Sequence, residues 1–171
     1  RKEFEKVSPL VSKKILEHAE IDEKRRPSGL SVEGIQNLLS AFMAVKIQAP
    51  PTDCLSPIED LLIKKGLEKA IDSRYAATVT RTPTVSQGNP FQVEVGLVFG
   101  GDLPSDGSVE VLRFANRVPL MYQQGGCLLT KGIESIDWRR YGLEQTGGKG
   151  VPKGPAAILV HLASTNVQFT S

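Results

Sequence analysis

Hydrophobic positions along the chain change their spacing near residue 72. Before that point, apolar residues recur at every third or fourth position, which is the period of an amphipathic helix. Ser8-Pro9 and Ser31 stand directly before two such stripes, and Ser56-Pro57 precedes a third. A serine N-cap, with proline at the first helical position, is a typical helix start. The stretch 1–72 therefore predicts short helices joined by tight turns.

Beyond residue 73 the apolar positions alternate, which is typical of half-buried strands. This alternation predicts strands over 75–82, 91–97 and 109–116. A hairpin loop over 100–108 is expected to join the last two.

Two later segments complete the predicted sheet module. Leu128, Gly132 and Ile136 recur at helical spacing and predict a helix over 125–136. The run 156–163 is apolar on both faces, which suits a central strand covered on one side by helix.

The patterns together predict an α+β fold with two modules. An all-helical module spans 1–72, and a β-rich module with a covering helix spans 73–171. A module of roughly 70 residues buries only about 60% of its surface. We therefore expect the helical module to lean on a neighbour.

Composition narrows the function classes. The 171 residues carry a net charge of +2, which argues against a strongly basic nucleic-acid coat. The hydrophobic content of 40% argues against a disordered tail. The longest unbroken apolar run has five residues, whereas a membrane span needs about 20. No signal peptide is visible, and we interpret the chain as an excised piece of a longer, intracellular protein.

The residues for catalysis or metal binding are sparse. Cys54 and Cys127 are expected to be buried, reduced thiols. His18 and His161 are expected to be structural, because no further ligand stands near them to complete a zinc site. A Cys127–His161 dyad is disfavoured because no orienting partner is evident. We therefore expect no catalytic and no metal site in this chain.

A glycine-rich loop raises the question of a phosphate site. Gly147-Gly148-Lys149-Gly150 resembles part of a P-loop, but the hydroxyl residue after the lysine is missing and a strand follows the loop. A flexible loop is the expected interpretation. A local phosphate contact by Lys149 and Lys153 is the minor alternative.

The most unusual cluster is Trp138-Arg139-Arg140-Tyr141. Residues 138–153 carry a net +3, because Arg139, Arg140, Lys149 and Lys153 face only Glu144. Guanidinium groups pair with phosphate oxygens and aromatic rings can stack, which favours a nucleic-acid contact. Alternatively, Trp138 and Tyr141 are core anchors and the arginines are merely solvated. Both interpretations remain open from composition alone.

Four ordered motifs resemble the B subunit of DNA topoisomerase VI. They read APPTDCLSPI (49–58), RFANRVPLMYQQG (113–125), SIDWRRYGL (135–143) and GPAAILVHLASTNV (154–167). The resemblance implies a helix-two-turn-helix domain over 1–72 and a transducer domain, truncated at its C-terminal end, over 73–171. It also implies a left-handed βαβ crossover.

The resemblance implies a function for the larger protein, a type IIB topoisomerase. ATP and magnesium, bound upstream of this chain, would drive dimerisation of the B subunits, and the transducer would pass that motion to the A subunit, which cleaves DNA. The switch lysine that reaches ATP is expected beyond Phe169-Thr170-Ser171. The family's W-K-x-Y motif matches Trp138, Arg139 and Tyr141, with arginine in place of lysine, which implies contact with DNA by these residues and Arg140.

Two other classes of function are weighed against this one. A stand-alone nucleic-acid-binding module of the helix-two-turn-helix type would have no need of the transducer motifs. A small metabolic enzyme would need a catalytic constellation that the sequence does not display.

Overall fold

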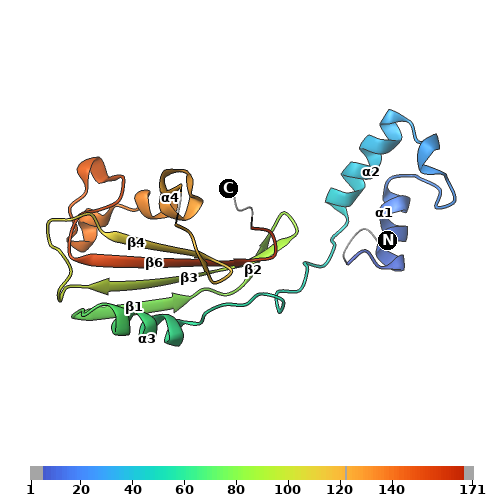
Figure 1. The fold of residues 1–171 in the computed structure, drawn as a ribbon. Helices are drawn as coiled ribbons and strands as arrows, with labels where there is room; N and C mark the ends of the chain where they lie inside the picture. The colour runs from blue at the N-terminus through green and yellow to red at the C-terminus, as the bar shows by residue number, and fades with distance from the viewer. Residues whose placement is uncertain (1–5, 122, 168–171) are drawn as a thin grey trace. The chain divides into compact units, whose positions relative to one another are not determined.

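The computed structural model describes residues 6–121 and 123–167, and the chain divides into two compact units, Arg1–Pro50 and Pro51–Ser171 (Figure 1). This division differs from the boundary predicted near residue 72. The third helix, α3 (Asp60–Ala70), packs on strands of the second unit through Ile63 and Leu67. Sequence periodicity identified that helix but could not show which unit buries its apolar face. The predictions made for Phe169–Ser171 lie outside the described residues.

The N-terminal unit contains α1 (Pro9–His18), a short 3-10 turn (Pro27–Gly29) and α2 (Val32–Ala44). Ser8 and Ser31 cap the two helices as predicted, since their hydroxyls accept from the backbone amides of Val11 and Gly34. The core of this unit consists of Ile15, Ala19 and Ala41, with seven partly buried apolar side chains around them.

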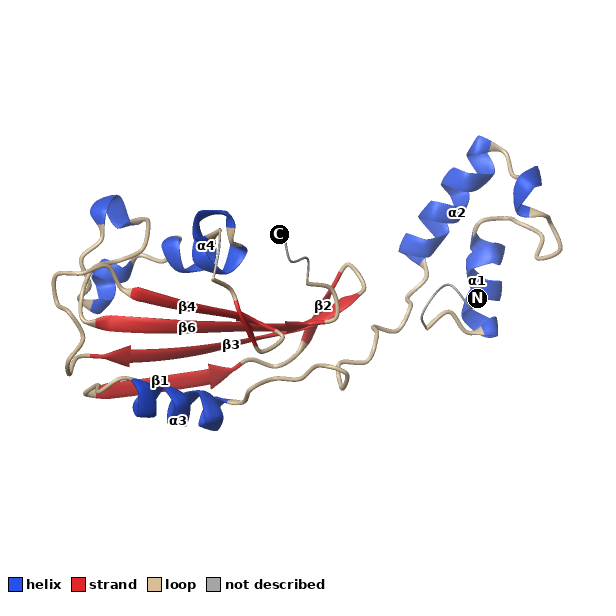
Figure 2. Ribbon diagram, viewed as in Figure 1, coloured by secondary structure: helices blue, strands red, loops and turns tan. Residues whose placement is uncertain are grey.

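The second unit is built on a six-stranded sheet with the order β1-β3-β6-β4-β5, and β2 pairs with β3 (Figure 2). The strands are β1 (Tyr75–Thr80), β2 (Thr84–Ser86), β3 (Asn89–Phe99), β4 (Glu110–Ala115), β5 (Val118–Pro119) and β6 (Ala156–Ser164). All pairs are antiparallel except β4 with β6, which are parallel. The connection between β4 and β6 contains α4 (Leu128–Glu134).

Both faces of the central strand β6 are covered, by α4 on one side and α3 on the other (Figure 2). Ile158 and Val160 face the α4 side, whereas Ala157 and Leu159 face the α3 side. The predicted central strand is confirmed, but cover on one side only is wrong. The second cover is α3, which the sequence patterns had assigned to the other module.

Three sequence predictions require correction. The proposed hairpin between 91–97 and 109–116 is wrong, because β6 lies between β3 and β4. Ser56-Pro57 does not begin a helix, because α3 starts at Asp60. The helix predicted over 125–136 is shorter, since Cys127 is extended and the 3-10 turn Gln124–Gly126 precedes it.

The thiols also differ from expectation. Both cysteines are free, but Cys54 is exposed and Cys127 is only partly buried. The double proline at 50–51 keeps the segment around Cys54 out of regular structure, and the thiol is exposed.

A buried carboxylate, Glu94 on β3, organises the α3 side of the sheet. Its oxygens accept hydrogen bonds of 2.7 Å from the backbone amides of Ile58 and Glu59, the hydroxyl of Thr80 and Nδ1 of His161. Glu94 and His161 are both fully buried. The expectation that His161 is structural is therefore confirmed.

A second layer of bonds surrounds this pair. Nε2 of His161 accepts from the backbone amide of Arg117 at 3.0 Å, so the imidazole proton lies on Nδ1 and points to Glu94. The guanidinium of Arg117 donates to the carbonyl of Pro57 at 2.6 Å. We call Glu94, Thr80, His161 and Arg117 the Glu94 network.

These donors keep Glu94 charged despite its burial. Burial alone raises the pKa of Glu94, but the amide of Ile58, the hydroxyl of Thr80, the imidazole of His161 and the amide of Glu59 all favour the carboxylate. Their combined effect holds the pKa of Glu94 below its usual value.

Gly96 on β3 packs closely against side chains of α3. A Cβ atom there would lie 2.5 Å from Cδ1 of Leu67 and 2.7 Å from Cγ2 of Ile63. We expect Gly96→Ala to destabilise the protein by about 1–3 kcal/mol through overpacking. Gly132→Ala, in α4 with no atom within 4 Å, is the control and should stabilise by about 0.5–1 kcal/mol. Chemical denaturation measures the free energy of unfolding of both variants. Equal changes in the two variants would contradict the close packing at Gly96.

The charge state of Glu94 predicts a pH dependence. Because the pKa of Glu94 is lower in the folded than in the unfolded state, its contribution to stability is complete above its ordinary pKa of 4.5. The contribution is lost as pH falls through the pKa of the folded state. The free energy of unfolding should therefore fall more steeply below pH 4.5 in the wild type than in Glu94→Gln. Parallel curves would show that Glu94 is not charged in the fold.

Candidate nucleic-acid interface

The aromatic and basic cluster forms a single 3-10 turn, Trp138–Tyr141, that follows α4. The four side chains do not point the same way. Trp138 packs against the core on the α4 side of the sheet, and its indole Nε1 donates to the carbonyl of Ile133 at 2.8 Å. The core-anchor interpretation therefore holds for Trp138.

The side chain of Gln145 holds this turn in place through hydrogen bonds. This buried side chain accepts from the amide of Trp138 at 3.0 Å and donates to the carbonyls of Ile136 and Gly150 at 3.0 and 2.6 Å. It thereby ties the turn to the glycine-rich loop. Sequence reasoning missed Gln145, because no local pattern distinguishes it from an exposed glutamine.

Arg139 is committed to a local ion pair. Its guanidinium donates two hydrogen bonds to Asp137, at 2.8 and 3.0 Å, and lies against Gly148. The bidentate hydrogen bond lowers the pKa of Asp137 and raises the pKa of Arg139. With Asp137 counted, the net charge over 137–153 is +2, from four cations and two acids. The net charge of +3 predicted from the sequence was counted from residue 138 and therefore omitted Asp137.

Arg140 and Tyr141 point outward. The side chain of Arg140 is 80% exposed, and its Nε lies 3.7 Å from Asp137. Tyr141 is 70% exposed, and its ring meets that of Trp138 edge-on with centroids 6.0 Å apart. These two side chains are thus presented to solvent by a turn whose tryptophan is anchored.

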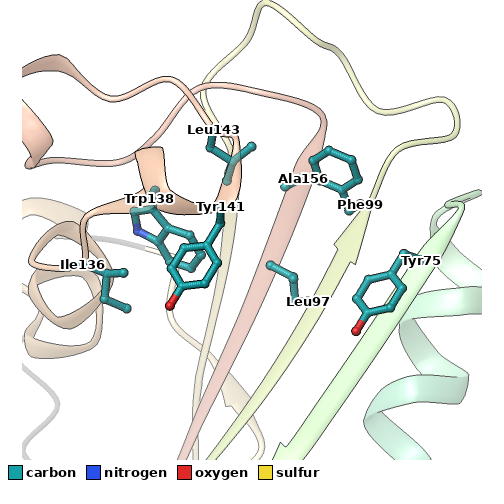
Figure 3. A pocket seen from close by; sticks show the side chains of 8 residues that line it. All are labelled: Tyr75, Leu97, Phe99, Ile136, Trp138, Tyr141, Leu143 and Ala156. Atoms are coloured by element: carbon teal, nitrogen blue, oxygen red, sulfur yellow. The ribbon is translucent and has the colours of Figure 1, made fainter.

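An apolar groove lies beside the turn (Figure 3). Trp138 and Tyr141 stand on one side, with Tyr75 and Phe99 across from them. The cavity volume is about 390 Å³. Its remaining lining residues are Leu97, Ile136, Leu143 and Ala156.

The two lysines of the glycine-rich loop lie near the same turn. Lys149 and Lys153 are exposed and line a small polar hollow with Glu144, Gln145 and Thr146. The contact between Arg139 and Gly148 joins this loop to the turn. The structure thus brings Arg139 and the loop together but leaves Glu144 beside the lysines, where it offsets part of their charge.

The other candidates for chemistry are separated. His161 is occupied by Glu94 and Arg117, so the described residues do not form the Cys127–His161 dyad. Burial raises the pKa of Cys127, whereas hydrogen bonds from the amide of Thr130 and the guanidinium of Arg113 lower it. Together these effects leave the pKa of Cys127 below its usual value. Within 6–121 and 123–167, no group of three or more potential metal ligands is found. No helix among these residues is both long and apolar enough to cross a bilayer.

The chain resembles known proteins over its whole length. Residues 50–171 match the family model of the topoisomerase VI B subunit transducer. The chain belongs to this family. The match begins at the boundary between the two compact units, and α3 therefore falls within the transducer region.

Curated relatives extend the match to the N-terminal unit. All 171 residues align at 53% identity with the B subunit of type 2 DNA topoisomerase 6 from Methanococcoides burtonii, and at 51% with that from Methanosarcina acetivorans. The protein of the same name from Archaeoglobus fulgidus is 43% identical over the same span. The chain covers 27–28% of the length of these relatives.

The anchoring of Trp138 can be measured separately from any DNA contact. Trp138→Phe removes the indole donor to Ile133 and should destabilise the fold by about 1–2 kcal/mol. Tyr141→Phe, at an exposed position, should stay within about 0.5 kcal/mol of the wild type. Thermal unfolding of both variants tests this difference. A neutral Trp138→Phe would mean that the indole is not a structural anchor.

Proposed function

We propose that this chain is the lever of a topoisomerase VI B subunit, relaying ATP-driven dimerisation of B subunits to the A subunit. The observation that carries the proposal is the transducer match over 50–171, on a sheet packed on both faces. A closely packed core resists compression, so it can transmit displacement without absorbing it.

Two finer assignments support this function. We assign the N-terminal unit to the helix-two-turn-helix class, on its two capped helices and the full-length alignment. We assign the β4–α4–β6 connection, which joins parallel neighbouring strands, as the left-handed crossover of the family. Family membership supports both assignments.

DNA is the proposed partner of the Trp138–Tyr141 turn. Arg140 and Tyr141 are the exposed members and would make the contact, Arg140 with phosphate oxygens and Tyr141 by packing. Trp138 and Arg139 would act indirectly by holding the turn in place. Lys149 and Lys153 are weaker candidates for phosphate, because Glu144 lies beside them.

The remaining partners follow from the family. ATP and Mg²⁺ would bind in other parts of the full-length protein, and DNA cleavage would belong to the A subunit. The B subunits would form a homodimer. Because the proposed substrate is cellular DNA, we place the protein inside the cell. A stand-alone nucleic-acid-binding module is disfavoured, since the transducer match covers 50–171.

The DNA contact predicts a selective loss of function. In the full-length B subunit with its A subunit, Arg140→Gln combined with Tyr141→Ala should reduce DNA stimulation of ATP hydrolysis several-fold. Loss of one phosphate contact should also lower the slope of log affinity against log salt by about 0.9. Thermal stability should change little, because both side chains are exposed.

Arg81→Gln is the matched control, because this arginine is exposed on the same unit and lies outside the cluster. Stimulation equal to that of the control would count against DNA contact at this turn. The lever assignment would then still stand, because it rests on the sheet and the family match.

A further inference from the structure

Residues 51–59, which we call the connector, open the second unit and lead into α3. The connector ends in three consecutive residues that are bonded to the sheet. The carbonyl of Pro57 accepts from the guanidinium of Arg117 at 2.6 Å. The amides of Ile58 and Glu59 donate to the carboxylate of Glu94, each at 2.7 Å. Bonds to the carbonyl of one residue and the amides of the next two leave this segment little freedom.

The groups that hold the connector come from different strands. Glu94 lies on β3 and is bonded to Thr80 at the end of β1. His161, on β6, links Glu94 to the backbone of Arg117. The Glu94 network therefore connects Pro57–Glu59 to two paired strands at the centre of the sheet and to both of their neighbours.

The turn that carries Arg117 is itself fixed. Asn116 and Arg117 join β4 to β5 with φ angles of +47° and +66°, the two positive values of a type I′ turn. The side chain of Asn116 exchanges two hydrogen bonds of 2.9 Å with the backbone of Ser164. The guanidinium of Arg117 thus reaches Pro57 from a rigid base.

The backbone of Glu59 shows that the connector conformation is imposed from outside. Glu59 has φ +77°, which a residue other than glycine rarely adopts. Such a conformation persists only where the surroundings determine it. Here the amide of Glu59 is held by Glu94, and α3 begins at the next residue.

Three of the four sequence motifs that resemble the family meet at this point. Residues 49–58 supply Pro57 and Ile58, residues 113–125 supply Arg117, and residues 154–167 supply His161. The fourth motif, 135–143, lies on the opposite face of the sheet with Trp138.

We propose that the Glu94 network is a clamp that passes displacement of the N-terminal unit into the transducer sheet. This inference rests on the lever function proposed above. Glu94, His161 and Arg117 are positioning residues in this scheme. Without the clamp, Pro57–Glu59 would absorb displacement by backbone rotation, whereas the clamped Pro57–Glu59 segment moves the sheet with it.

The first test measures whether the clamp holds the connector in the full-length B subunit. Arg117→Gly removes the guanidinium yet suits the turn, because Asn-Gly is favoured in type I′ turns. Hydrogen exchange in a peptide covering 55–59 should accelerate about tenfold. A peptide covering β6 should be unchanged. Glu94→Gln should give the same pattern, and Arg81→Gln, at an exposed arginine in the loop between β1 and β2, should match the wild type.

The second test measures transmission with the A subunit present. In Arg117→Gly, ATP-driven strand passage should fall several-fold while ATP hydrolysis is retained. Accelerated exchange together with this uncoupling supports the proposal. Unchanged exchange in both variants overturns it, and so does faster exchange with normal strand passage. Equal loss of hydrolysis and passage would also overturn it, because that pattern indicates general damage.

Failure of the lever function has a different signature. A wild-type complex that performs no ATP-dependent strand passage contradicts the lever, and the transmission claim is lost with it. The exchange experiment then still decides whether Glu94 and Arg117 hold the connector.

Discussion

A carboxylate taken out of water must replace its hydration with protein donors, and Glu94 replaces it with four. Removing a single donor would leave a buried charge incompletely satisfied, which is costly. The donors come from the connector, from β1 and from β6, so these segments must be in place together. The start of α3, the pairing around β3 and the conformation of Pro57–Glu59 all depend on this one buried charge.

The sequence predicted the elements that local patterns determine. Serine caps and helical spacing identified α1 and α2, alternation identified β1, β3 and β4, and a run that is apolar on both faces identified β6. It failed where partners are distant in sequence. No local signal shows that β6 inserts between β3 and β4. Ser56-Pro57 has the residues of a helix start, but the amide of Ile58 is bonded to Glu94, which lies 36 residues further along the chain and leaves no signal near Ser56.

The candidate interface shows the same limit at the scale of side chains. Composition identified Trp138–Tyr141 as unusual, but it could not show that the indole faces the core while Tyr141 faces solvent. The charge count also omitted Asp137, which binds Arg139 in two hydrogen bonds. The orientation of the side chains in a turn depends on the buried groups that hold its backbone, and here Gln145 is that group.

The Trp138 turn and the Glu94 network lie on opposite faces of one sheet. The Trp138 turn packs with the α4 side, whereas Ile58 and α3 pack with the other, and β6 contributes alternate side chains to both cores. A displacement applied at Pro57 therefore reaches the turn only through this strand layer. Each residue of β6 from Ala156 to Val160 is buried, so neither core can shift without moving the other. For the relay of motion proposed here, burial on both faces is what makes the sheet move as a single body.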